Sequence, residues 1–148
     1  MSAVAGVAAG AVALFPTETP THTVALSPLQ ERLGEGVVGT IHYGAAVVFI
    51  VSLAVISYFY GVREGARDTR QGKRSPVFWR RYHWSCAGGI AAALLWILVT
   101  ELAGGPSKSL LIGEAVSVWA FGASWFMKGF ELDALRGTER LPRAVAQG

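Results

Sequence analysis

Long apolar runs separated by short polar segments dominate this chain. A helix needs roughly 20 apolar residues to cross the ~30 Å hydrocarbon core of a bilayer. Three runs meet that length, and a shorter apolar run precedes them at the N-terminus. We therefore predict an all-helical transmembrane bundle that forms a single membrane domain, with four spans preferred and three as the fallback. The predicted spans are residues 2–15, 37–62, 82–103 and 110–128.

The first run is the least certain span because it is short. It extends from Ser2 to Phe15 and stops at Pro16. As a helix it would reach only about 21 Å, which is less than the thickness of the core. A secretory signal would have Lys or Arg before the run, and none is there, although Ala11-Val12-Ala13 resembles a cleavage site. A short first span is the preferred interpretation.

The basic residues are gathered in two segments. Seven of the thirteen Lys and Arg lie between Arg63 and Arg81, and four more lie from Lys128 onward. Short loops rich in Lys and Arg stay in the cytoplasm. We therefore predict a cytoplasmic basic loop (63–81), an external loop (17–36) and a cytoplasmic tail (129–148). With four spans both termini are cytoplasmic, in the cytoplasmic membrane of a bacterium.

This charge pattern also bears on partners. Charged residues make up 16% of the chain, against about a quarter in soluble domains, so a basic face on a soluble fold is not offered. We expect membrane lipids as partners, with anionic lipids at the basic loop, and no nucleic acid. A membrane protein partner or a homo-oligomer is a further possibility.

Aromatic and cationic residues mark the predicted cytoplasmic boundary of the spans. Trp and Tyr are enriched where a span meets the headgroups, and a cation commonly follows them. The predicted interfacial anchors are Tyr58, Trp79, Arg81, Tyr82, Trp84, Trp125 and Lys128. His83 stands among them and is read as one more member of this belt.

Three ionisable residues fall inside the predicted spans: His42, Glu101 and Glu114. Such groups are costly in lipid, so each is a candidate for function. Helix rise places all three about 8 to 12 Å outward of the midplane, and Ser117 could join Glu114. The cluster suggests binding of a lipid or protein partner or, alternatively, a small proton or cation carrier using His42 and Glu114. An interhelical polar clamp would be the purely structural role.

Other chemistry finds little support in the sequence. Haem held by His42 and His83 is excluded because the two would be separated by on the order of 25 Å along the membrane normal. His22 with His42 is geometrically open but has no haem motif. Nucleophile and phosphate-loop motifs are missing, so no catalytic residue, metal or cofactor is predicted. The serines in the spans are expected to bond back to their own helices: Ser52, Ser57, Ser117 and Ser124. The single cysteine, Cys86, is read as a small packing residue.

Small residues in the spans are predicted to allow close helix packing, because lipid gives helices no hydrophobic drive to associate. The small residues proposed for packing are Gly44, Ala45, Ala46, Gly88, Ala92, Ala93, Ala115, Gly122 and Ala123.

Outside the spans, Ser27 and Pro28 predict the start of a short helix, as its N-cap and first residue.

Two segments carry a resemblance. HYGAAVVFIVSLAVIS begins at His42, and EAVSVWAFGASWFMKG begins at Glu114. Together they resemble a group of small uncharacterised bacterial integral membrane proteins, over residues 41–131. The resemblance implies a four-helix membrane bundle and names no substrate. The motif residues that it indicates are His42, Arg81, Tyr82, Glu114, Trp119, Gly122, Trp125 and Lys128.

Overall fold

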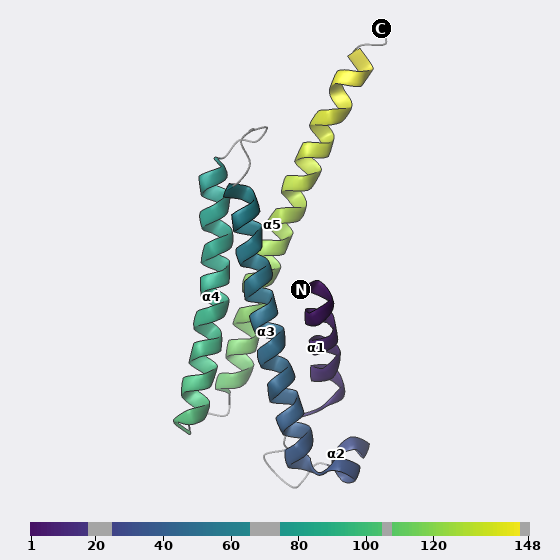
Figure 1. Cartoon of the computed structure of the whole chain (residues 1–148), viewed down its shortest axis with the longest axis vertical. Helices are drawn as coiled ribbons and strands as arrows, with labels where there is room; N and C mark the ends of the chain where they lie inside the picture. Colours follow the sequence, from purple (N-terminus) through teal and green to yellow (C-terminus); the bar gives the residue numbers. More distant parts are fainter. Residues whose placement is uncertain (18–24, 66–74, 105–107, 146–148) are drawn as a thin grey trace. The chain divides into compact units, whose positions relative to one another are not determined.

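All regular elements in the described part of the chain are helices. A computed structural model describes residues 1–17, 25–65, 75–104 and 108–145. Within these ranges the elements are α1 (Ser2–Leu14), α2 (Pro28–Leu33), α3 (Glu35–Gly65), α4 (Pro76–Leu102) and α5 (Ser109–Val145), as Figure 1 shows. The prediction of an all-helical fold is confirmed.

Three helices in the described ranges are long and apolar enough to cross a membrane: Glu35–Glu64, Pro76–Leu102 and Ser109–Phe130. They correspond to the three long predicted spans. α1 has 13 residues and is a shorter apolar helix. At 1.5 Å per residue it extends about 20 Å. Three candidate spans are thus established, and the fourth is not confirmed.

The helices are longer than the predicted spans, and this shortens the predicted basic loop. α3 continues to Gly65, while α4 already begins at Pro76. Ser75 explains that early start, because its side chain accepts a hydrogen bond from the Phe78 backbone N–H and Pro76 suits the first helical position. The centre of the loop, residues 66–74, lies outside the described residues.

Most of the predicted tail is helical. α5 continues from its apolar part without a break to Val145. Helix therefore covers residues 129–145 of the predicted tail, and residues 146–148 lie outside the described residues.

The chain divides into two compact units, residues 1–52 and 53–148. The first unit contains α1, α2 and the first part of α3. Ser27 and Gln30 form a reciprocal capping box at the start of α2, as predicted for Ser27 and Pro28. The Gln30 side chain then donates to the Thr17 carbonyl at 3.2 Å. Residues 18–24 of the predicted external loop, including His22, lie outside the described residues.

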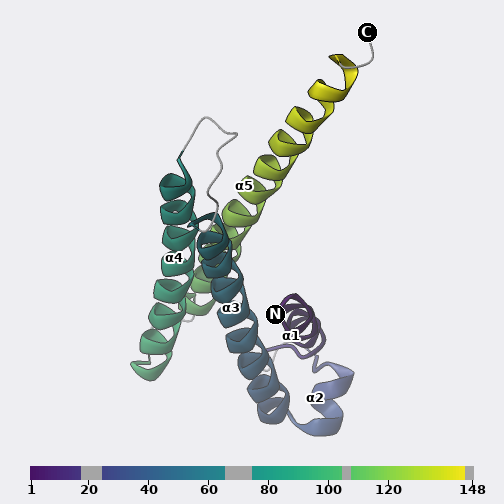
Figure 2. The ribbon, with the colours of Figure 1, turned by 45° about the horizontal axis from the view of Figure 1, so that its top comes forward.

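The second unit contains the remainder of α3 together with α4 and α5. α4 and α5 pack against each other in opposite directions, and α5 then extends beyond the start of α4 (Figures 1 and 2). Gly113 of α5 faces Ile97 and the Ala93 carbonyl of α4, and Gly61 of α3 faces Trp84. A side chain at either glycine would collide with its neighbour, so these two positions allow the close approach of the helices.

The predicted packing glycines are therefore the wrong ones. A Cβ added to Gly44, Gly88 or Gly122 would meet no atom within 4 Å. Ala46 and Ala93 are buried as expected, while Ala115 and Ala123 are exposed. Composition alone could not show which face of each helix meets a neighbour.

Large apolar side chains cover the outside of the second unit. Trp119 is 80% exposed, and Leu95 and Trp125 are 62% and 60% exposed. The interior holds a few apolar side chains, such as Ile90 and Ile97, together with many polar ones, among them Ser57, Ser117 and Ser124. Apolar groups outside and polar groups inside are the arrangement expected of helices surrounded by lipid.

Candidate functional site

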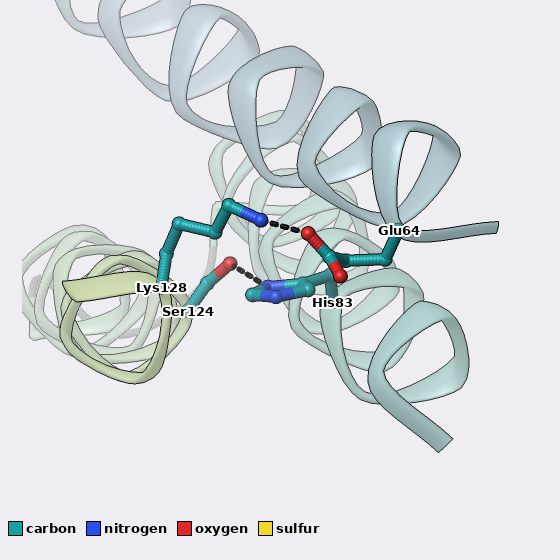
Figure 3. A network of polar contacts seen from close by, with 4 residues as sticks. All are labelled: Glu64, His83, Ser124 and Lys128. Carbon is teal, nitrogen blue, oxygen red and sulfur yellow. Dashed lines mark hydrogen bonds and ion pairs between the residues drawn. The ribbon is translucent and has the colours of Figure 1, made fainter. Parts of the chain in front are cut away.

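Four polar side chains meet inside the second unit, where the end of α3 lies beside the beginning of α4. They are Glu64 of α3, His83 of α4, and Ser124 and Lys128 of α5. Figure 3 shows them pointing toward one another from the three helices. The Lys128 ammonium donates to Oε1 of Glu64 in an ion pair. Nδ1 of His83 and Oγ of Ser124 are 2.8 Å apart. We call these four residues the inner polar cluster.

Helix geometry explains why the inner polar cluster forms. Ser124 and Lys128 are four residues apart and therefore lie on the same face of α5. Glu64 is the penultimate residue of α3, so it can reach that face from the helix end. His83 lies two turns into α4, on the same side as the buried Ile90. Each of the three helices contributes at least one member.

The inner polar cluster is buried. His83 and Ser124 have no exposed surface, and the side chains of Glu64 and Lys128 are 2% and 12% exposed. Taking a carboxylate and an ammonium out of water costs several kcal/mol for each ion, and a close pair offsets that cost only with good geometry. The contact between Glu64 and Lys128 is thus a condition for either group to occupy this position.

A serine, a histidine and a carboxylate also occur together in nucleophilic enzymes. Here Ser124 and His83 are both fully buried, so no acyl substrate has access to the hydroxyl. Within the described ranges, no group of three or more His, Cys, Asp or Glu could hold a metal ion. The geometry of the inner polar cluster suits proton exchange and helix association better than attack on a substrate.

A second feature lies on the surface beside the inner polar cluster. The rings of Tyr58 and Trp84 stack with their centroids 5.8 Å apart and their planes within 7°. The Arg80 guanidinium lies 5.4 Å from the Trp84 ring centroid. Arg63 and Arg81 are exposed at the same end of α3 and α4. We call these five residues the aromatic-basic surface.

His42 lies in the first unit and has a partner there. Its Nδ1 is 2.6 Å from the backbone carbonyl oxygen of Phe15, and the residue is 8% exposed. A carbonyl oxygen can only accept, so Nδ1 carries the proton. In a neutral ring, Nε2 is then the acceptor.

The other predicted site residues belong to the second unit. Glu101 is exposed near the end of α4, and Glu114 is partly buried on α5. Ser117 is fully buried, and its hydroxyl donates to the Gly113 carbonyl at 2.8 Å. Ser52 likewise donates to the Val48 carbonyl, as predicted for serines in spans. The grouping of Glu101, Glu114 and Ser117 with His42 stays a prediction.

Two sequence interpretations, those of His83 and Ser124, need correction at the inner polar cluster. His83 is not a member of the interfacial belt, because it is fully buried and bonded to Ser124. Ser124 does not simply bond back to its own helix. Lys128, a predicted anchor, is turned inward to Glu64. Of the other predicted anchors, Tyr58, Arg81, Trp84 and Trp125 are exposed, and Trp79 and Tyr82 are partly exposed.

One pattern in the sequence indicates part of the inner polar cluster. Ser124 and Lys128 share a helix face and lie within an otherwise apolar run. Their partners could not be chosen from sequence, because Glu64 is 64 residues from Lys128 and His83 is 41 residues from Ser124.

Comparison of the chain with protein-family models, curated proteins and solved structures finds no match.

Proposed function

We propose that this chain is a non-enzymatic integral protein of the bacterial cytoplasmic membrane that binds anionic lipid headgroups at the aromatic-basic surface. The observation that supports this most directly is the stack of Tyr58, Trp84 and Arg80. Aromatic rings and arginines prefer the headgroup level, and a guanidinium donates well to phosphate. In this proposal α3, α4 and α5 span the bilayer, with the 63–81 segment on the cytoplasmic side.

The charges at this end of the second unit favour an anionic partner. Arg63, Arg80 and Arg81 are three cations close to the ends of α3 and α4. The carboxylate nearby, Glu64, is paired with Lys128. Each Lys or Arg near an anionic membrane surface contributes about 1 kcal/mol to lipid attraction. The three arginines can therefore attract phosphate.

Lipid retention after purification tests the proposal. The wild-type chain is expected to keep phosphatidylglycerol in preference to phosphatidylethanolamine when native mass spectra are recorded from mixed-lipid nanodiscs. Arg80→Gln with Arg63→Gln should reduce the retained phosphatidylglycerol several-fold. Arg32→Gln is the matched control, because it removes one charge from an exposed residue of α2. Equal retention in all three proteins would refute lipid binding at this surface.

The predicted outer cluster supports a second candidate, a small proton or cation carrier. The favouring observation is that the bond from His42 to Phe15 leaves Nε2 as the acceptor in a neutral ring. This candidate assigns the carrier function to His42 and Glu114, as proposed from the sequence. Reconstituted vesicles with a pH-sensitive dye test it: Glu114→Gln should abolish ion flux in a carrier. A loss of thermal stability alone would indicate a clamp.

We also propose that α1 is a short fourth span, with both termini in the cytoplasm. A bilayer can thin locally around a short apolar helix at modest cost. Single cysteines at residues 2 and 70, in a chain with Cys86→Ser, test this proposal. Labelling of both from the cytoplasmic side supports four spans, and labelling from opposite sides supports three.

A further inference from the structure

The inner polar cluster contains three titratable side chains in one buried space. Glu64 and Lys128 carry opposite charges that cancel. His83 is the third, and it is fully buried. An imidazole ordinarily gains or loses its proton between about pH 5 and pH 8. The charge of the whole inner polar cluster therefore depends on the protonation state of His83.

Ser124 allows His83 to exist in either state. A hydroxyl can donate one hydrogen bond and accept others. With a neutral ring whose Nδ1 is unprotonated, Ser124 donates to Nδ1 across the 2.8 Å contact. With a doubly protonated ring, Nδ1 donates and the same oxygen accepts. A rotation of the hydroxyl is enough to keep the hydrogen bond, whereas a fixed donor or a carbonyl would favour one state.

The groups around His83 have opposing effects on its charge. From α3, the Glu64 carboxylate favours the protonated imidazole of His83. The ring of Tyr60, also on α3, has its centroid 5.7 Å from that of His83. From α5, the ammonium of Lys128 disfavours it. Tyr82, the preceding residue on α4, contacts the ring at 5.5 Å and is neutral at ordinary pH. The ion pair thus holds both a stabilising and a destabilising charge close to the imidazole.

Lys128 is the member of the inner polar cluster that is most accessible to water. Its side chain is 12% exposed, and Glu64 is one residue from the end of α3.

We propose that the inner polar cluster is a proton-binding site. His83 takes up one proton from water, the Glu64 carboxylate balances the new charge, and Ser124 changes from hydrogen-bond donor to acceptor. The cluster then passes from net zero to net +1. This site is separate from the aromatic-basic surface and does not depend on lipid binding there.

NMR spectra of the histidine side chains, recorded from the full chain in nanodiscs, test the proposal directly. The chain has three histidines, so His22→Gln and His42→Gln variants assign the ¹⁵N signals of His83. Between pH 8 and pH 5 the His83 signals should change from a neutral to a doubly protonated ring. A single unchanged state over that range, in the wild-type protein, would overturn the proposal without any variant of the site.

Two variants then distinguish a proton-binding site from a buried histidine that gains a proton only when the surrounding helices open locally. Glu64→Gln should move the His83 transition to lower pH by about one unit or more, because the balancing charge is lost. Lys128→Met should move it to higher pH. Transitions that coincide with wild type in both variants would contradict the assignment of Glu64 and Lys128 to the site.

Proton uptake gives an independent readout that does not require these variants to fold. On acidification of lightly buffered nanodiscs from pH 8 to pH 5, the wild-type chain should take up about one more proton than His83→Gln. His42→Gln is the matched control for the number of histidines. Equal uptake by His83→Gln and wild type would also overturn the proposal.

Discussion

The two histidines in the candidate spans show how differently a buried imidazole can be held. His42 bonds to the Phe15 backbone, and that contact lies within the first unit. His83 bonds to a hydroxyl on another helix, beside an ion pair that joins α3 to α5. The first contact fixes one tautomer of the ring, and the second does not. Loss of the first affects one local contact, whereas loss of the second affects the packing of α4 against α5.

The largest predicted effect tests the ion pair of the second unit. Lys128→Met leaves the Glu64 carboxylate buried without its cation, and breaking such a pair costs about 3–5 kcal/mol. The thermal midpoint in detergent should fall sharply. The double variant Glu64→Met with Lys128→Met should regain most of the loss, because no charge is left unpaired. A double variant as unstable as the single one would show that packing, not charge, is responsible.

The next effect tests the close approach of α4 and α5. Gly113→Val forces a side chain into Ile97 and the Ala93 carbonyl, so we expect a loss of about 1–3 kcal/mol. Gly122→Val on the same helix is the matched control, because its Cβ position is open. Detergent unfolding of both variants measures the difference. Equal losses would mean that helix propensity alone explains them.

A smaller effect tests the link between His83 and Ser124. Ser124→Ala removes the hydrogen bond between α4 and α5 and should cost about 1 kcal/mol in detergent unfolding. Ser117→Ala is the control, since that hydroxyl bonds within α5. Because Ser117 contributes nothing between helices, its variant should lose less. The reverse order would contradict the role given to Ser124.

The smallest effect tests the contact in the first unit. His42→Phe removes the bond to the Phe15 carbonyl and keeps a ring of similar size. Hydrogen bonds between membrane helices average about 0.6 kcal/mol, and we expect a loss near that value. Hydrogen exchange at the α1 amides should increase, while amides near Ser124 stay unchanged. Increased exchange at both places would show that the two histidines are not independent.

The sequence predicted what depends on periodicity and run length, and it missed what depends on pairing. The three long helices followed from apolar runs, and Ser27 with Pro28 identified the start of α2. The sequence places Glu64 in the basic loop, because the predicted span ends at residue 62. Its burial depends on α3 continuing to Gly65 and on Lys128 reaching it from α5. Neither the extent of α3 nor this pairing could be predicted from the sequence, because Glu64 and Lys128 are 64 residues apart.

The central claim is that lipid surrounds the outer face of the second unit while polar groups lie inside it. A nitroxide at Trp119→Cys, in a Cys86→Ser chain reconstituted in bicelles, tests it most directly. Trp119 is 80% exposed near the middle of a candidate span. The probe should be strongly relaxed by oxygen, which concentrates in lipid, and weakly by a water-soluble nickel chelate. Strong relaxation by the chelate would contradict the claim.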